Sequence, residues 1–202
     1  MNATTIVYLH GFNSSPQSVK GRAIARVAAA LPDPPRFHLP ALAHRPAQAM
    51  REVCAWIDSA DVDRANLALV GSSLGGFYAT WLAERHGARA VVINPAIRPA
   101  ADLRPFLGRQ RNPHTGVEYD VTLAHFVELE ALEVAPITRP ERYFLLVRTG
   151  DELLDWRVAS AFYAGASQYV AGGGDHGWED FGAEIDSVLR FCTRAVSAGA
   201  HK

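Results

Sequence analysis

A glycine-rich stretch at residues 71–76, GSSLGG, constrains the fold of this chain more than any other feature. It follows an apolar run at residues 67–70 and precedes a helix-like segment at residues 77–86. At such a junction the pattern G-x-S-x-G predicts a sharp strand-to-helix turn, in which larger residues at the two glycine positions would collide. The turn would raise the Ser73 hydroxyl above the sheet, at the positive end of a helix dipole. Ser73 is therefore a candidate nucleophile, although an ordinary glycine-rich turn can carry the same five-residue pattern.

Strand-like and helix-like segments alternate along the rest of the chain. The predicted strands are residues 6–9, 37–40, 67–70, 90–93, 143–147 and 168–170. The predicted helices are residues 14–30, 47–59, 74–86, 156–163 and 181–195. Short apolar runs without polar alternation are typical of strands buried on both faces of a parallel sheet. We therefore expect a three-layer α/β fold, with a mostly parallel sheet of about six strands and helices on both faces.

The alternation breaks between residues 96 and 139, where about forty residues separate two predicted strands. A turn-forming cluster at residues 112–116 lies in this segment, followed by a helix-like stretch at residues 123–132. We interpret residues 97–139 as a small lid inserted into a single domain that spans residues 1–202.

Composition excludes several classes of partner. The chain has 202 residues, of which 49% are hydrophobic and 20% charged, as in one soluble globular domain. With 20 basic and 21 acidic residues it offers no electrostatic basis for binding nucleic acid or an anionic membrane. Neither a signal peptide nor an apolar run of membrane-spanning length is recognisable. Cys54 and Cys192 lie in apolar helix-like stretches and are expected to be free thiols. These features predict a cytoplasmic protein and leave its oligomeric state open.

A serine nucleophile needs a base within hydrogen-bond reach and a group that orients this base. In hydrolases built on this type of sheet, the chain order is serine, then an acid, then histidine. Asp151 follows the predicted strand at residues 143–147, and His176 follows the one at residues 168–170. Both lie at carboxyl ends of strands, where open parallel sheets place their ligands. We therefore predict a catalytic triad of Ser73, Asp151 and His176.

Other residues compete for these roles. Glu152, Asp155 and Asp175 are alternative acids, but Asp155 is better placed to cap a helix. His10 is an alternative base, for which bracing a loop by hydrogen bonds is the simpler role. The remaining histidines show no metal-ligand spacing; they are His38, His44, His86, His114, His125 and His201. The predicted chemistry thus uses neither a metal nor a cofactor.

Two backbone N–H groups are candidates for an oxyanion hole. One belongs to Leu74, the residue after the nucleophile, and the other to Phe12, in the loop after the first strand. Gly11 would let the backbone approach the reacting carbonyl closely. Preorganised donors of this kind stabilise the negative charge of a tetrahedral intermediate.

Five blocks of the sequence resemble the YqiA-type esterases, a bacterial family of small α/β hydrolases. The blocks are residues 8–16, 70–76, 94–99, 112–116 and 149–155, and they span nearly the whole chain in the family's order. The resemblance implies a three-layer α/β-hydrolase fold. It also implies a cytoplasmic carboxylesterase acting on acyl esters or thioesters, with Ser73, Asp151 and His176 as its triad. Asp175 departs from the asparagine more usual in the family, and this extra carboxylate could raise the basicity of His176. Trp178 keeps the family's aromatic residue.

We expect Ser73 to attack small-molecule acyl esters and form an acyl-enzyme. One alternative is an acyl-CoA thioesterase, for which arginines near the insertion would bind the nucleotide; they are Arg98, Arg104, Arg109 and Arg111. Another is a catalytically silent binding protein with the same fold. Some residues could form an acyl-binding wall, although core packing is the favoured role for most of them; they are Phe106, Phe126, Leu129, Leu132 and Trp178. The sequence does not specify the acyl group or the leaving group.

Overall fold

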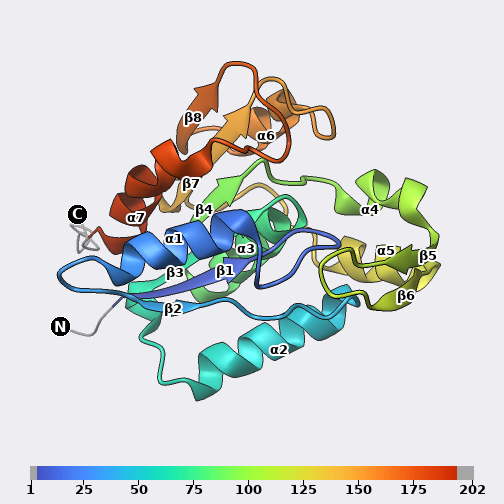
Figure 1. The fold of residues 1–202 in the computed structure, drawn as a ribbon, viewed down its shortest axis with the longest axis horizontal. Helices are drawn as coiled ribbons and strands as arrows, with labels where there is room; N and C mark the ends of the chain where they lie inside the picture. The colour runs from blue at the N-terminus through green and yellow to red at the C-terminus, as the bar shows by residue number, and fades with distance from the viewer. Residues whose placement is uncertain (1–3, 195–202) are drawn as a thin grey trace.

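The computed structural model describes residues 4–194 and contains a six-stranded parallel sheet in the order β2-β1-β3-β4-β7-β8 (Figure 1). The strands are β1 Thr5–Leu9, β2 Arg36–His38, β3 Leu67–Ser72, β4 Arg89–Ile93, β7 Tyr143–Arg148 and β8 Ser167–Ala171. The central strands β1, β3 and β4 are buried along their entire length. These strands are continuous apolar runs because helices cover both faces of the sheet. The predicted α/β-hydrolase architecture is confirmed.

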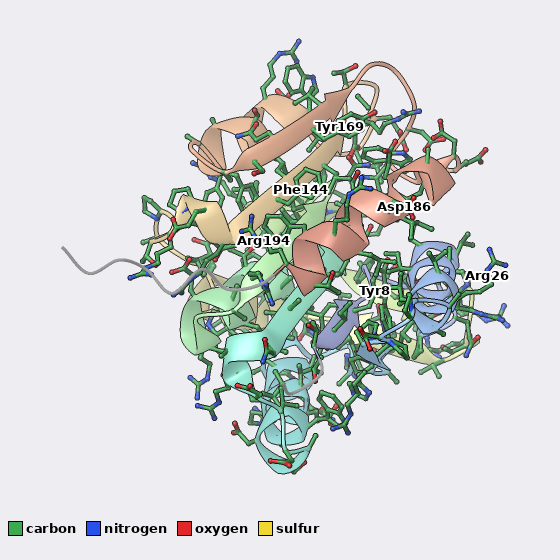
Figure 2. All side chains as sticks on the ribbon, turned by 90° about the vertical axis from the view of Figure 1, so that its left-hand side faces the viewer. Tyr8, Arg26, Phe144, Tyr169, Asp186 and Arg194 are labelled. Atoms are coloured by element: carbon green, nitrogen blue, oxygen red, sulfur yellow. The ribbon has the colours of Figure 1, made fainter. Side chains whose placement is uncertain are left out.

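Five helices form the two outer layers. They are α1 Val19–Ala29, α2 Pro46–Ser59, α3 Leu74–His86, α6 Trp156–Phe162 and α7 Ile185–Thr193. Buried residues of α1 and α7, such as Ile24 and Val188, pack on one face of the sheet, and residues of α2, α3 and α6 pack on the other. Figure 2 shows Tyr8 between α1 and α7, and Arg26 on the outer side of α1. Each large aliphatic side chain buried in these layers contributes roughly 1.5–3 kcal/mol of transfer free energy.

The helix predicted to begin near residue 14 begins later. The Ser15 hydroxyl accepts a hydrogen bond from the Gln17 N–H at 3.1 Å, and the Ser15 carbonyl accepts one from the Ser18 N–H at 3.0 Å. These bonds close a turn, so α1 starts only at Val19. The loop between β1 and α1 is therefore longer than predicted and stays at the carboxyl end of β1.

The helix predicted over residues 181–195 is interrupted at its start. It comprises a 3₁₀ turn, η4 Phe181–Glu184, followed by α7. Ala195, at its predicted end, lies outside the described residues. Two further 3₁₀ turns are η1 Arg64–Asn66 and η3 Pro140–Arg142.

The segment between β4 and β7 contains a second, two-stranded sheet. Its elements are α4 Pro99–Asp102, η2 Arg104–Phe106, β5 Gly108–Arg111, β6 Glu118–Val121 and α5 Leu123–Ala131. The strands β5 and β6 pair as an antiparallel hairpin, and the predicted turn cluster at residues 112–116 forms its loop. This hairpin lies with α4 and α5 at one end of the molecule, on the right in Figure 1.

Both cysteines are free, as predicted; Cys54 is half-buried and Cys192 is buried. Within residues 4–194, no helix is both long enough and apolar enough to cross a bilayer. In the same range, no three His, Cys, Asp or Glu side chains cluster closely enough to hold a metal ion.

Candidate active site

Ser73 lies at the junction of β3 and α3 in a strained backbone conformation. Its φ is 57° and its ψ is −124°, a combination rarely adopted by residues other than glycine. The Ser73 N–H donates to the Ile93 carbonyl at 3.0 Å, and the Ser73 carbonyl accepts from the Gly76 N–H at 2.8 Å. Strain of this kind costs about 1–3 kcal/mol and persists only where surrounding bonds impose it. The junction is thus the sharp turn that the sequence pattern predicts.

The two glycines around Ser73 are required by close backbone contacts. A Cβ atom on Gly71 would lie 2.1 Å from the Gly75 carbonyl oxygen, and one on Gly75 would lie 2.0 Å from the Leu9 carbonyl oxygen. Neither distance is compatible with any side chain. The pattern therefore reflects how tightly α3 packs onto β1 and β3.

His176 and Asp151 form a hydrogen-bonded pair on the loops that follow β8 and β7. The distance between His176 Nδ1 and Asp151 Oδ2 is 2.8 Å. The other carboxylate oxygen of Asp151 accepts backbone N–H bonds from Leu153 and Leu154, each at 2.9 Å. The Asp151 side chain is only 2% exposed, and that of His176 is 16% exposed. A carboxylate at Nδ1 places the proton there and leaves Nε2 free to act as a base.

The environment of Asp151 favours its charged form. Burial alone would raise the pKa of this carboxyl, but hydrogen bonds from His176 and from the Leu154 and Leu153 N–H groups lower it overall. The carboxylate is therefore ionised at neutral pH and can stabilise an imidazolium on His176.

Two residues that no sequence pattern indicates hold the His176 loop. The Asn94 side chain donates to the His176 carbonyl at 3.1 Å and accepts from the Arg148 N–H at 2.9 Å. Lys20, on α1, donates to the Gly177 carbonyl. Asn94 stands one residue after β4, but nothing local in the sequence indicates a bond to a loop so far along the chain.

The alternative acids have other partners. Asp155 caps α6 by accepting from the Arg157 N–H at 2.9 Å, as predicted. Asp175 accepts from the Trp178 N–H at 2.6 Å, and Glu152 accepts from the His176 N–H at 3.0 Å. The carboxylate bonded to the His176 ring is that of Asp151. Asp175 makes no hydrogen bond to this ring in the described part of the chain.

His10 braces the loop after β1. Its Nδ1 lies 2.9 Å from the Gly11 carbonyl oxygen, and its Nε2 accepts from the Leu42 N–H at 3.3 Å. Because both ring nitrogens are engaged with the backbone, His10 is not available as the base. The structural role predicted for it is confirmed.

The predicted oxyanion-hole donors lie on either side of Ser73. In the part of the chain that the structure describes, the N–H groups of Phe12 and Leu74 donate to no protein acceptor. A Cβ built on Gly11 would lie 3.8 Å from Ser73 Oγ, which shows how close the Phe12 loop comes to the serine. Over the same residues, no hydrogen bond joins Ser73 to His176. Such bonds are commonly long before substrate binds.

A pocket of about 320 Å³ begins beside the N-terminus of α3. Leu74 and Phe12 form part of its wall, together with Leu42, Tyr78 and, from the hairpin of the insertion, Tyr119. No Asp, Glu, Lys or Arg is among its lining residues. The site therefore offers an uncharged, largely apolar space next to the candidate oxyanion hole.

The residues suggested for an acyl-binding wall lie elsewhere. Phe126, Leu129 and Leu132 pack in the core, and Trp178 is buried against Phe181 on the opposite face of the sheet. Phe106 is 40% exposed and packs on Phe12, with 5.3 Å between ring centroids. Helical spacing indicated burial correctly but could not distinguish a core from a pocket.

Comparison with known proteins identifies the family. The model of an uncharacterised protein family, UPF0227, matches residues 5–193. The chain belongs to this family. The resemblance to the YqiA-type esterases is thereby confirmed.

Several solved structures are similar in fold to this UPF0227 member. Mouse alpha/beta hydrolase domain-containing protein 10 is 18% identical, with 94% of this chain and 91% of that one covered and a TM-score of 0.69. Est1E from Butyrivibrio proteoclasticus is 12% identical, with 96% and 90% covered and a TM-score of 0.69. The esterase domain of a Rhodothermus marinus protein is 18% identical, with 92% and 84% covered and a TM-score of 0.67. At these identities the likeness shows the α/β-hydrolase fold.

Proposed function

We propose that this protein is a serine carboxylesterase that cleaves small-molecule acyl esters through an acyl-enzyme intermediate. Ser73 Oγ attacks the acyl carbon while His176 Nε2 takes its proton, and Asp151 stabilises the resulting imidazolium. The Phe12 and Leu74 N–H groups bind the oxyanion. His176 then protonates the leaving alcohol, and a water molecule, deprotonated by His176, hydrolyses the acyl-enzyme.

The bond between His176 and Asp151 is the single observation that carries this proposal. The bond fixes the tautomer of His176. This histidine follows the carboxyl end of β8, and the strained Ser73 follows the carboxyl end of β3 in the same parallel sheet. A histidine that only stabilised its loop would not need a buried carboxylate at Nδ1. The fold and the unpartnered N–H groups support the same reaction class.

The pocket favours esters over acyl-CoA thioesters. A coenzyme A group carries phosphates, yet neither Lys nor Arg is among the pocket's lining residues. Of the arginines considered for nucleotide binding, Arg109 pairs with Glu118 at 2.6 Å, and Arg104 lies over the Phe126 ring. Arg98 lines a separate groove.

Steady-state hydrolysis of p-nitrophenyl esters with acyl chains of increasing length tests the proposal. Ser73→Ala should lower kcat on the order of 10⁴-fold or more. Ser72→Ala is the matched control, because the neighbouring hydroxyl has no role in the reaction and most of the activity should remain. Full activity of Ser73→Ala would refute the assignment. Faster turnover of acyl-CoA than of oxygen esters would favour the thioesterase, and no hydrolysis by folded wild type would favour the binding protein.

A further inference from the structure

Tyr78 lines the same pocket as Leu74 and carries a hydroxyl group that the proposed mechanism does not use. It lies four residues after Leu74 on α3, so the two side chains share one face of the helix. Tyr78 is only 3% exposed and lines the pocket. Its hydroxyl forms no hydrogen bond with any residue in the range 4–194, and it is not sealed from solvent. Two other buried tyrosines are paired: the Tyr163 hydroxyl lies 2.6 Å from the Thr80 hydroxyl, and the Tyr143 hydroxyl donates to Glu84 at 2.6 Å.

The hydroxyl is open to solvent in the free pocket, so a bound ligand that covers it without offering an acceptor would leave it buried without a partner, which is costly. Burial also raises the pKa of Tyr78, so the group remains a neutral phenol that can donate a hydrogen bond. Tyr78 lies one helical turn beyond Leu74, the candidate oxyanion-hole residue. Its hydroxyl could therefore bond a substrate atom that is a few bonds away from the ester carbonyl.

His44, an exposed residue that lines the same pocket, supplies a second donor. The Thr122 N–H donates to His125 Nδ1 at 3.1 Å, which leaves the proton of His125 on Nε2. This Nε2 lies 3.1 Å from His44 Nδ1 and donates to it. The proton of His44 is therefore on its own Nε2, which has no partner among the described residues. Stacking on Tyr119, with 4.6 Å between ring centroids, holds the His44 ring in place.

Charges near His44 neutralise one another. Arg45 and Glu128 form an ion pair behind the ring, and the pocket lining itself contains no Asp, Glu, Lys or Arg. Burial, followed by the neighbouring Arg45 charge, lowers the pKa of His44, so its ring is neutral at pH 7. Tyr78 and His44 therefore offer uncharged donors to a ligand, beside the neutral amide and hydroxyl side chains of Asn13, Asn112 and Thr115 in the same lining.

From this arrangement, and resting on the proposed esterase function, we infer that the pocket selects esters whose bound chain is uncharged and carries a hydrogen-bond acceptor such as an ether, hydroxyl or carbonyl oxygen. Tyr78 and His44 are the specificity-determining residues. A purely alkyl chain would leave the Tyr78 hydroxyl buried without a partner, and a phosphorylated or carboxylated chain would find no cation in the pocket.

A set of matched esters tests this inference. p-Nitrophenyl hexanoate is compared with analogues in which an ether oxygen replaces one methylene of the acyl chain. The oxygen is moved along the chain from one analogue to the next, and the carbon next to the carbonyl is left unchanged. The esterase proposal is tested separately from this inference. It holds if wild type hydrolyses the hexanoate and Ser73→Ala does not. Tyr78→Phe removes one oxygen atom without altering the shape of the side chain.

We expect Tyr78→Phe to lower kcat/KM about three- to tenfold for at least one ether analogue, the usual effect of losing one hydrogen bond, while hexanoate changes less than twofold. His44→Leu should have the same selective effect for an oxygen placed further along the chain. Tyr163→Phe, which removes a hydroxyl outside this pocket, should leave every ratio between substrates unchanged. Equal effects of Tyr78→Phe on all substrates, or none, would overturn the inference while leaving the esterase proposal intact. No hydrolysis of any ester by wild type would overturn both.

Discussion

The side chain of Asn94 donates a hydrogen bond to the main-chain carbonyl of His176 at 3.1 Å and accepts one from the Arg148 N–H at 2.9 Å. A single side chain thereby connects the ends of β4 and β7 to the loop that carries the proposed base. Asn94 is 2% exposed and has a φ of 40°, a left-handed conformation that asparagine tolerates better than most residues.

Replacing Asn94 should therefore affect both stability and turnover. Asn94→Ala should destabilise the fold by about 1–3 kcal/mol for the unsatisfied Arg148 N–H, plus roughly 1 kcal/mol for the left-handed backbone. Asn94→Gly should avoid the cost of the left-handed backbone but still lose the bond to the Arg148 N–H. Both variants should lose about tenfold in kcat, since the base is no longer held in place. Urea unfolding and ester kinetics measure these effects, and an unchanged kcat in Asn94→Gly would argue against a positioning role.

The tight turn around Ser73 predicts a large difference between two glycine substitutions. A Cβ on Gly75 would lie 2.0 Å from the Leu9 carbonyl oxygen, whereas one on Gly182 would meet nothing within 4 Å. Gly75→Ala should therefore cost at least about 3 kcal/mol or prevent folding, and Gly182→Ala should change stability by less than about 0.5 kcal/mol. Thermal or urea unfolding compares them. Wild-type stability of Gly75→Ala would contradict the described packing.

His10 should make the fold sensitive to mild acid. Burial lowers the pKa of His10 below its unfolded value of about 6.5, so the unfolded chain binds the proton more readily. The stability this provides is complete above about pH 6.5 and is lost as the pH falls toward the folded pKa. The difference in unfolding free energy between wild type and His10→Gln should thus shrink from pH 7.5 to pH 5. If urea titrations show a difference that does not vary with pH, His10 does not titrate as described.

The hairpin of the insertion is bonded to the loop that carries Phe12. The Tyr119 hydroxyl donates to Asn13 Oδ1 at 2.6 Å, and Asn112 donates to the Ser14 carbonyl at 2.8 Å. Tyr119→Phe should lower kcat about three- to tenfold with little change in KM, because the Phe12 N–H is less well held. Tyr169→Phe, at an exposed tyrosine on β8, is the control. Equal kcat values for the two variants would show that the hairpin does not position this loop.

The sequence was sufficient to predict the parallel sheet because its strands are continuous apolar runs. Residues 67–70 and 90–93 belong to strands buried on both faces, so no polar alternation obscures them. The strands of the insertion are different. Both β5 and β6 consist largely of polar residues, since neither is covered on two faces, and they gave no strand signal.

Residues that bond across the site were not predictable from local patterns. The predicted helix at residues 14–30 begins only at Val19, because bonds to Ser15 close a turn before it. Asn94 and Lys20 act on a loop more than eighty residues away along the chain, where sequence spacing carries no information. His176 and Asp151 could be placed because each follows a recognisable strand.

The central claim is that Ser73 is a nucleophile activated by His176. Its most direct test is reaction of the folded protein with a fluorophosphonate probe, followed by intact-mass measurement and peptide mapping. The account predicts one adduct per chain on Ser73, formed far more slowly in His176→Ala and absent from Ser73→Ala. A folded wild-type protein that remains unlabelled, or that carries the adduct on another residue while Ser73 is unmodified, would contradict it.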